Sequence, residues 1–287
     1  MKIKITSDST LDLTPELLEK YNIATIALAV NLGEKTYFDG IDIVPEDIYK
    51  YFDETGELPK TGARSPEDYK DFFQKYLDEG YEIVHVGIGS ELSCSYGNCR
   101  LAAQELKGVY TVDSQTLSSG TGLLALYASD LTKSGKYSAK EIAEKVSNRA
   151  KASQSSFIIE KLKFLHKGGR CSMLSVLGAN ILRIKPCIQV VDGKNTVARK
   201  YMGNMISCVK KYCEDTLKIY NTPDHTRVMI TYSTATPEML ETAKEVLESY
   251  GKFKEILITQ AGSVINSHCG RNTLGVLYLN DGDEGHM

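Results

Sequence analysis

The amino-acid sequence predicts an α/β protein of two domains, the first built on a parallel sheet and the second containing antiparallel strands. In the first half, short apolar runs alternate with helical patterns, as in parallel sheets that are covered by helices. After about residue 155 this alternation changes, because Asp192-Gly193-Lys194-Asn195 stands between two strand-like runs and is typical of a β-hairpin. We therefore predict domains at residues 1–155 and 156–287.

Four apolar runs in the first half have the length and composition of buried strands: Ile3–Thr6, Ile23–Val30, Ile83–Ile88 and Val109–Val112. Helices are predicted at about residues 15–21, 45–53, 66–79, 92–106, 119–134 and 138–151. Thr14-Pro15-Glu16 and Ser65-Pro66-Glu67 each supply an N-cap, a proline at the first helical position and an acid in the first turn. Val44-Pro45-Glu46 opens a helix without a capping side chain.

The second half predicts another α/β unit. Ile188–Val191 and Thr196–Tyr201 are the arms of the hairpin, and a helix from about residue 204 to 220 follows them. A helix at Pro237–Tyr250 then lies between strands at Val228–Tyr232 and Glu255–Thr259.

The composition is that of an ordinary soluble globular protein, with 42% hydrophobic and 25% charged residues among 287. A net charge of −3 and the lack of a dense basic block argue against a nucleic-acid partner. Seven cysteines without CxxC pairing argue against a disulfide framework and a zinc site. No apolar run is long enough to span a membrane and the opening residues turn polar at once, so, together with the cysteine usage, we expect a cytoplasmic protein. No apolar surface stripe is obvious, so we expect a monomer.

Small hydroxyl residues follow three of the predicted strands. They occur in Thr6–Thr10, in Gly89–Ser95 and in Asp113–Gly120. Any one of these segments is typical of a helix N-cap. Because the carboxyl ends of parallel strands share one edge of a sheet, the three together predict a hydroxyl-lined pocket for an anion.

The segment Leu165–Gly193 combines a turn with a charge and an apolar run. Gly168 and Gly169 permit positive φ and would aim the Arg170 guanidinium, which suits a carboxylate or phosphate. The run Met173–Ile184 is mostly apolar. A cation beside an apolar wall fits an amphipathic acid, although a plain surface loop would also contain these residues.

Among the five histidines, only His268 is a candidate site residue. His85 lies in a predicted buried strand and is expected to be structural, and His166 is expected at the surface. His268 lies in a glycine- and hydroxyl-rich segment, predicted to be a loop, that follows the last predicted strand. No GxSxG, HExxH or Walker sequence accompanies it, so the sequence recommends no catalytic class.

An ordered set of motifs resembles the DegV family of bacterial fatty-acid-binding proteins over essentially the whole chain. The motifs are Ser7-Asp8-Ser9-Thr10 with Asp12-Leu13, Thr61 with Ser65, Ser90–Tyr96, Asp113–Ser118 with Gly120–Gly122, Leu162–Leu165 with Gly168-Gly169-Arg170 and Ile184-Lys185-Pro186, and His268-Cys269-Gly270. The chain departs from the family pattern at Cys94, where the family has glycine, and at Arg271-Asn272, where it has Pro-Gly.

The resemblance implies a protein without catalytic activity or cofactor that encloses one long-chain fatty acid, such as palmitate, between its two domains. It further implies that the carboxylate is held at the rim and presented to a separate fatty acid kinase, in support of phospholipid metabolism, with at most transient membrane contact. The carboxylate-binding residues would be Thr61 and Ser93, with Ser95 in place of the family's threonine. The complete predicted ligand-binding set is Thr61, Ser93, Ser95, Ser118, Arg170 and His268.

Two other hypotheses remain open at the level of sequence. One is a serine-dependent acyl hydrolase or transferase, with Ser93 as nucleophile and His268 as base. The other is a regulatory binding module in which lipid only fills the interior.

Overall fold

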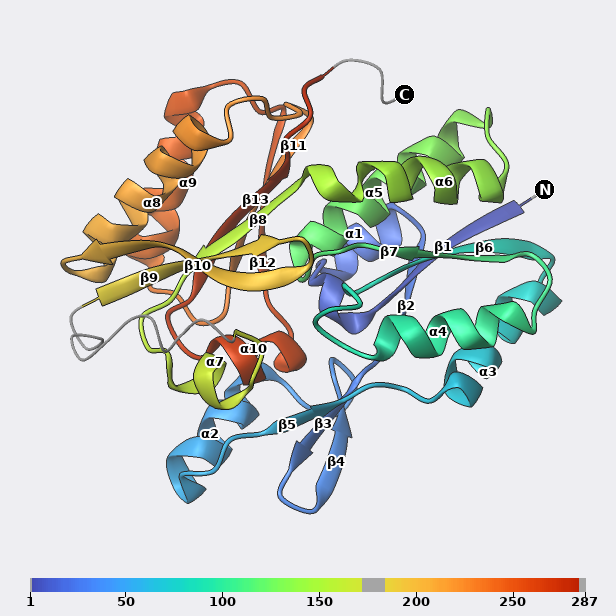
Figure 1. Ribbon diagram of the computed structural model, residues 1–287, viewed down its shortest axis with the longest axis horizontal. Coiled ribbons are helices and arrows are strands. Elements are labelled where there is room, and N and C mark those ends of the chain that lie inside the picture. The colour runs from blue at the N-terminus through green and yellow to red at the C-terminus, as the bar shows by residue number, and fades with distance from the viewer. Residues whose placement is uncertain (1, 172–183, 284–287) are drawn as a thin grey trace.

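Three β-sheets and the helices between them make up the computed structural model, which describes residues 2–171 and 184–283 (Figure 1). A parallel sheet occupies the N-terminal part and a mixed, largely antiparallel sheet the C-terminal part. The predicted α/β class is confirmed.

The parallel sheet contains β1 (Lys2–Asp8), β2 (Ile23–Ile26), β6 (Tyr81–Gly87) and β7 (Val109–Asp113), in the order β2-β1-β6-β7. All three pairings are parallel, so the strand ends converge on one edge. β1, β6 and β7 correspond closely to predicted strands.

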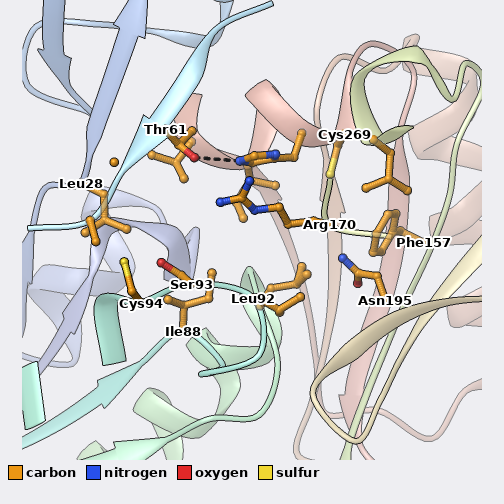
Figure 2. A pocket seen from close by; sticks show the side chains of 17 residues that line it. Leu28, Thr61, Ile88, Leu92, Ser93, Cys94, Phe157, Arg170, Asn195 and Cys269 are labelled. Carbon is orange, nitrogen blue, oxygen red and sulfur yellow. Dashed lines mark hydrogen bonds between the residues drawn. The ribbon is translucent and has the colours of Figure 1, made fainter. Parts of the chain in front are cut away.

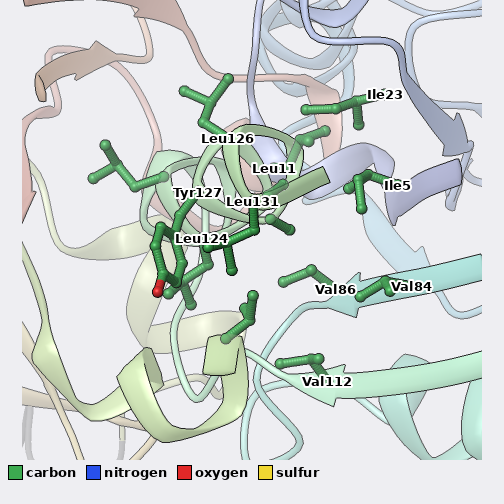
Figure 3. Packing of buried hydrophobic residues seen from close by; sticks show 14 of the residues in the cluster. Ile5, Leu11, Ile23, Val84, Val86, Val112, Leu124, Leu126, Tyr127 and Leu131 are labelled. Carbon is green, nitrogen blue, oxygen red and sulfur yellow. The ribbon is translucent and has the colours of Figure 1, made fainter. Parts of the chain in front are cut away.

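Helices cover both faces of this sheet. Val84 and Val86 of β6 pack against α5 (Ser119–Ser134) and α6 (Ala139–Arg149) (Figure 3). Ile83 faces α3 (Pro66–Asp78) and α4 (Ser95–Gln104), as does His85, whose ring lies against Tyr69. The expected burial of His85 is confirmed, since the residue is completely buried within this core.

The predicted starts of the helices are confirmed, with one exception. The Thr14 and Ser65 hydroxyls accept hydrogen bonds from the backbone N–H groups of Leu17 and Asp68, as N-caps do. α4 begins at Ser95 and not at residue 92, because residues 89–93 form a turn in which Leu92 N–H donates to the Gly89 carbonyl.

The prediction of one strand over Ile23–Val30 is wrong. Ile26 ends β2, and the chain then leaves the parallel sheet while Leu28 N–H donates to the Ser9 hydroxyl. A small antiparallel sheet follows, in the order β4-β3-β5: β3 (Ala29–Leu32), β4 (Lys35–Phe38) and β5 (Lys60–Gly62). An apolar run alone does not tell one buried strand from two that turn a corner.

The mixed sheet has the order β10-β9-β8-β13-β11-β12. Its strands are β8 (Ser153–Ile158), β9 (Ile184–Val191), β10 (Lys194–Met202), β11 (Arg227–Tyr232), β12 (Glu255–Gln260) and β13 (Leu274–Leu279). Only β11 and β12 pair in parallel. The hairpin is confirmed as β9 and β10. The sequence prediction missed two strands. β8 is buried but rich in serine, so it lacks an apolar pattern, whereas β13 is plainly apolar and was overlooked.

Helix α5 lies between the two large sheets. α8 (Met205–Ile219) and α9 (Pro237–Tyr250) cover one face of the mixed sheet, and α5 packs against its other face. Leu277 of β13 therefore belongs to the same hydrophobic cluster as Ile5 of β1. A helix that is buried on nearly every side joins two layers into one core. The boundary near residue 155 stays a prediction.

Four further α-helices are α1 (Pro15–Lys20), α2 (Pro45–Thr55), α7 (Lys163–Lys167) and α10 (Ser263–Cys269), and short 3-10 helices lie at Ser9–Leu11 and Ala150–Ala152. α7 and α10 pack together, and α10 also contacts α2 and β5, so a junction forms between the small sheet and the mixed sheet. The predicted loop around His268 is in fact α10. The apolar run Met173–Ile184 lies outside the described residues except for Ile184, which begins β9.

Candidate functional site

A cavity opens at this junction, with walls from both halves of the chain (Figure 2). About 720 Å³ of space free of protein atoms lies in the cavity and before its mouth, and part of this volume is open solvent. Seventeen residues line it: Leu28, Thr61, Gly62, Ala63, Ile88, Leu92, Ser93, Cys94, Leu117, Phe157, Leu165, Arg170, Asn195, Val264, Ile265, His268 and Cys269. Most of this lining is aliphatic or aromatic, and the polar groups are few, as in sites for amphipathic ligands.

The mouth of the cavity is polar. Ser93, Cys94, Arg170 and Asn195 also line an open surface recess, so the cavity reaches solvent beside them. A second, smaller cavity, lined almost entirely by buried residues and called the inner cavity below, shares Leu117, Phe157, Ile265 and Cys269 with the first. A ligand with a polar end and a long apolar end would match this order of surfaces.

Thr61 and His268 meet in the cavity wall. β5 supplies Thr61 and α10 supplies His268, and 2.8 Å separates Thr61 Oγ1 from His268 Nε2. Burial lowers the pKa of His268 to about 4, and the nearby positive charge of Arg170 acts in the same direction. The imidazole is therefore neutral at pH 7, and its Nδ1 has no hydrogen-bond partner among the described residues.

Two buried carboxylates dock the N-terminal end of α10. Asp12 accepts a hydrogen bond from Gly262 N–H at 2.8 Å, and Asp39 accepts one from Ser263 N–H at 2.7 Å. Each satisfies a backbone donor that the helix leaves free at its start. The position of His268 therefore depends on acidic residues more than 200 positions away in the sequence.

The two glycines before Arg170 have different roles. Gly169 has a φ of +68°, but Gly168 has an ordinary helical φ of −69°. A Cβ on Gly168 would lie 2.6 Å from His268 Nδ1, so Gly168 is small because the imidazole approaches it. Glycine permits a positive φ at both positions, and only Gly169 adopts one.

Arg170 is exposed, and its guanidinium extends into the cavity mouth (Figure 2). Its Nη1 donates to the Gly168 carbonyl at 2.7 Å. Within residues 2–171 and 184–283 it forms no ion pair with an acidic side chain. The cation is free to meet an anionic group that enters from solvent.

The structure gathers four of the six predicted site residues around one cavity: Thr61, Ser93, Arg170 and His268. Ser95 is fully buried behind Ser93, 2.9 Å from it between the hydroxyl oxygens. Ser118 lies away from the rim, where it lines the inner cavity and donates to Asp12. The roles of all six in binding stay predictions.

The predicted hydroxyl-lined anion pocket at three strand ends does not form. Among those hydroxyl residues, Ser93 alone lines the cavity. The others bond within the protein, as in the pairs Ser114–Thr121 and Thr116–Ser155. Hydroxyl groups that are brought together can satisfy each other and need no ligand.

Sequence reasoning missed Asn195, which it placed in the hairpin turn. Asn195 belongs to β10, opposite Val190 of β9, and is 6% exposed. The turn consists of Asp192 and Gly193 alone. A shift of one residue in the register of a hairpin moves a side chain to the other face of the sheet. The turn sequence alone was therefore not sufficient to predict that Asn195 lines the cavity.

A family model described as "Uncharacterised protein, DegV family" matches residues 2–281. The chain belongs to the DegV family. A fatty acid-binding protein of Thermotoga maritima is 32% identical over 96% of each chain. The resemblance of the sequence motifs to this family is thereby confirmed.

Solved DegV structures share the fold. A fatty-acid-binding DegV family protein of Thermus thermophilus superposes with a TM-score of 0.88 at 29% identity, covering 98% of this chain and 100% of its own. A stearic-acid-binding protein of Eubacterium ventriosum gives a TM-score of 0.81 at 25% identity, with 98% of both chains covered. In the part of this DegV chain that the structure describes, every helix is too short or too polar to cross a membrane.

Proposed function

We propose that this DegV protein binds one long-chain fatty acid such as palmitate, with the alkyl chain in the two joined cavities and the carboxylate at the mouth. The observation that carries the proposal is the order of surfaces. Arg170, which has no acidic partner among the described residues, lies at the mouth with Ser93, and apolar walls lie behind them. Relatives that bind fatty acids support the same ligand.

Burial of the alkyl chain supplies the affinity. At about 0.8 kcal/mol per methylene, some fifteen methylenes contribute about 12 kcal/mol before the cost of immobilising the ligand. Hydrogen bonds to a charged carboxylate add about 1.5–3 kcal/mol each. The tail therefore sets affinity, while Thr61 and Ser93 set which end of the ligand faces the mouth.

We further propose that the protein is a carrier without catalytic activity, which presents the carboxylate to a fatty acid kinase. Ser93 bonds to Ser95, and His268 bonds to Thr61. No hydrogen bond joins Ser93 to His268 in the described chain, so the nucleophile and base of the hydrolase hypothesis are not paired. Such a carrier acts as a cytoplasmic monomer and supplies acyl groups to phospholipid metabolism.

The first experiment is solvent extraction of the purified protein followed by mass spectrometry. We expect one fatty acid per chain, or uptake of one added palmitate per chain after lipid removal. A clean extract with no uptake contradicts the proposal. Ester hydrolysis that is lost in Ser93→Ala would instead support the hydrolase.

The carboxylate site is tested with the double variant Thr61→Val/Ser93→Ala. Loss of two hydrogen bonds to a charged group predicts roughly 100-fold weaker palmitate binding and slower phosphorylation by a fatty acid kinase. Fluorescence competition measures the affinity. The exposed pair Thr36→Val/Ser134→Ala is the matched control, and unchanged affinity in the site variant refutes the assignment.

A further inference from the structure

One buried side-chain amide in the cavity wall has an oxygen without a hydrogen-bond partner among the described residues. Asn195 lies at the start of β10, and its side chain is among the cavity-lining groups near Phe157 and Leu92 (Figure 2). It is 94% buried, and its Oδ1 has no hydrogen-bond partner in residues 2–171 or 184–283.

An unpaired amide oxygen is costly in such a place. A buried acceptor without a donor loses its hydrogen bonds to water and gains none, whereas an apolar side chain of similar size would suit the leucine and phenylalanine around it. The rest of the hairpin does not need the amide, because β10 pairs with β9 through the backbone. A ligand group that bonds to both amide atoms would remove this cost.

A carboxylate alone cannot do so. When ionised it only accepts hydrogen bonds, so it can pair with Asn195 Nδ2 but leaves Oδ1 unpaired. A hydroxyl group can donate to Oδ1 and accept from Nδ2 at once. Asn195 lines both the cavity and the surface recess, so the hydroxyl would lie near the carboxyl end of the ligand.

We propose that Asn195 is a specificity residue that favours fatty acids with a hydroxyl group on the second or third carbon. This inference rests on the proposed fatty-acid site and names a narrower ligand class for it. The carboxylate stays at the mouth beside Arg170, and the hydroxyl bonds to the amide as the chain enters the apolar cavity.

The test compares four ligands on the delipidated full-length protein by competition with a fluorescent fatty acid: hexadecanoic acid and its 2-, 3- and 16-hydroxy derivatives. Asn195→Leu removes both amide atoms at nearly constant size. Asn148→Leu, on the exposed face of α6, is the matched control. The measured quantity is the ratio of Kd for hexadecanoic acid to Kd for each hydroxy acid.

We expect this ratio to fall three- to tenfold in Asn195→Leu for the 2- or the 3-hydroxy acid, as for one lost hydrogen bond. It should stay unchanged for the 16-hydroxy acid and in Asn148→Leu. An unchanged ratio for both the 2- and 3-hydroxy acids overturns the inference while leaving the fatty-acid site intact. Equal weakening of hexadecanoic acid and its hydroxy derivatives also overturns it, since the amide would then bind the carboxylate. If no ligand binds the wild-type protein, the proposed function itself fails.

Discussion

Two polar clusters lie between the N-terminal and C-terminal sheets, and they differ in how their hydrogen bonds are completed. In the acidic cluster, formed by Asp8, Asp12 and Asp39, every carboxylate oxygen accepts at least one hydrogen bond from the protein. At the cavity, His268 Nδ1 and Asn195 Oδ1 have no hydrogen-bond partner among the described residues.

The comparison separates polar groups that hold the fold from those that await a ligand. Burial raises the pKa of all three carboxyl groups. Asp12 and Asp39 nevertheless accept hydrogen bonds at the start of α10, and Asp8 accepts one from Ile88, just after β6. The cavity groups are similarly enclosed but are left incomplete. Because an unpaired buried polar group is costly, one that lies in the wall of a cavity favours a ligand-binding role there.

The largest expected effect comes from Asp12→Ala. The substitution removes the acceptor for Gly262 N–H and for the Ser118 hydroxyl, and it puts alanine at a φ of +51°. Two orphaned buried donors and an unfavourable backbone predict a loss of about 4 kcal/mol in the free energy of unfolding. Urea denaturation of the delipidated protein measures it.

Asp12→Asn is the matched control, since its side chain keeps an acceptor oxygen and tolerates positive φ. It should lose less than half as much stability. If Asp12→Ala unfolds at nearly the wild-type urea concentration, the acidic cluster does not hold α10 in place, and the contrast between the two clusters fails.

The pH dependence of His268 has the next largest effect. Its pKa is lowered from the ordinary 6.5 to about 4, so the unfolded chain takes up a proton at higher pH than the native protein does. The neutral ring supports the fold above pH 6.5, and that support is lost as the pH falls toward 4. About 3 kcal/mol should disappear over this range.

Unfolding free energies between pH 7 and pH 4 for wild type and His268→Gln measure this effect. The variant should lose less stability than the wild type on acidification. His166→Gln, which removes an exposed ring three residues after α7 begins, is the control. Parallel pH profiles for wild type and His268→Gln would mean that the imidazole is not kept neutral by its surroundings.

A pair of glycine variants tests whether the close packing of Gly168 against His268 is needed for palmitate binding. In Gly168→Ala the new methyl group would lie 2.6 Å from His268 Nδ1 and 3.0 Å from the Phe164 carbonyl oxygen. We expect the imidazole to shift away from Thr61, with about 2 kcal/mol lost in stability and at least tenfold in palmitate affinity.

Gly169→Ala is the contrasting neighbour, because its methyl group meets no atom within 4 Å and only the φ of +68° opposes it. It should cost about 1 kcal/mol in stability and leave affinity nearly unchanged. Equal losses of palmitate affinity in the two variants would show that the turn, and not the approach of His268, matters. Calorimetric titration gives the affinities, and urea denaturation gives the stabilities.

The sequence was sufficient where local signals decide the structure. The N-caps at Thr14 and Ser65 and the hairpin at Asp192-Gly193 follow from side-chain and turn chemistry within a few residues. α10 could not be found this way. Its start is held by Asp12 and Asp39 from across the fold, and a seven-residue segment is too short to form a stable helix alone.

The candidate site was predictable in its motifs but not in its hydrogen bonding. The family motifs indicate Thr61, Ser93, Arg170 and His268, and the structure brings these four together. The Thr61–His268 contact joins residues 207 positions apart, and no periodicity reports such a pairing.

The smallest expected effect is that of Cys94→Gly, which restores the residue typical of the family at the mouth. Cys94 has φ −73° and ψ −3°, a conformation that any residue adopts, so the backbone does not require glycine here. The side chain is exposed, and its removal frees little buried surface.

Calorimetric titration should show palmitate affinity within about threefold of wild type, and urea denaturation a stability loss of about 0.5–1 kcal/mol from added backbone freedom. Cys94→Ala separates the thiol from that freedom and should match wild type in both. A tenfold gain in palmitate affinity for either variant would mean that the thiol obstructs the carboxylate. The Cys94 side chain, in addition to the unpaired polar groups, would then limit binding at the mouth.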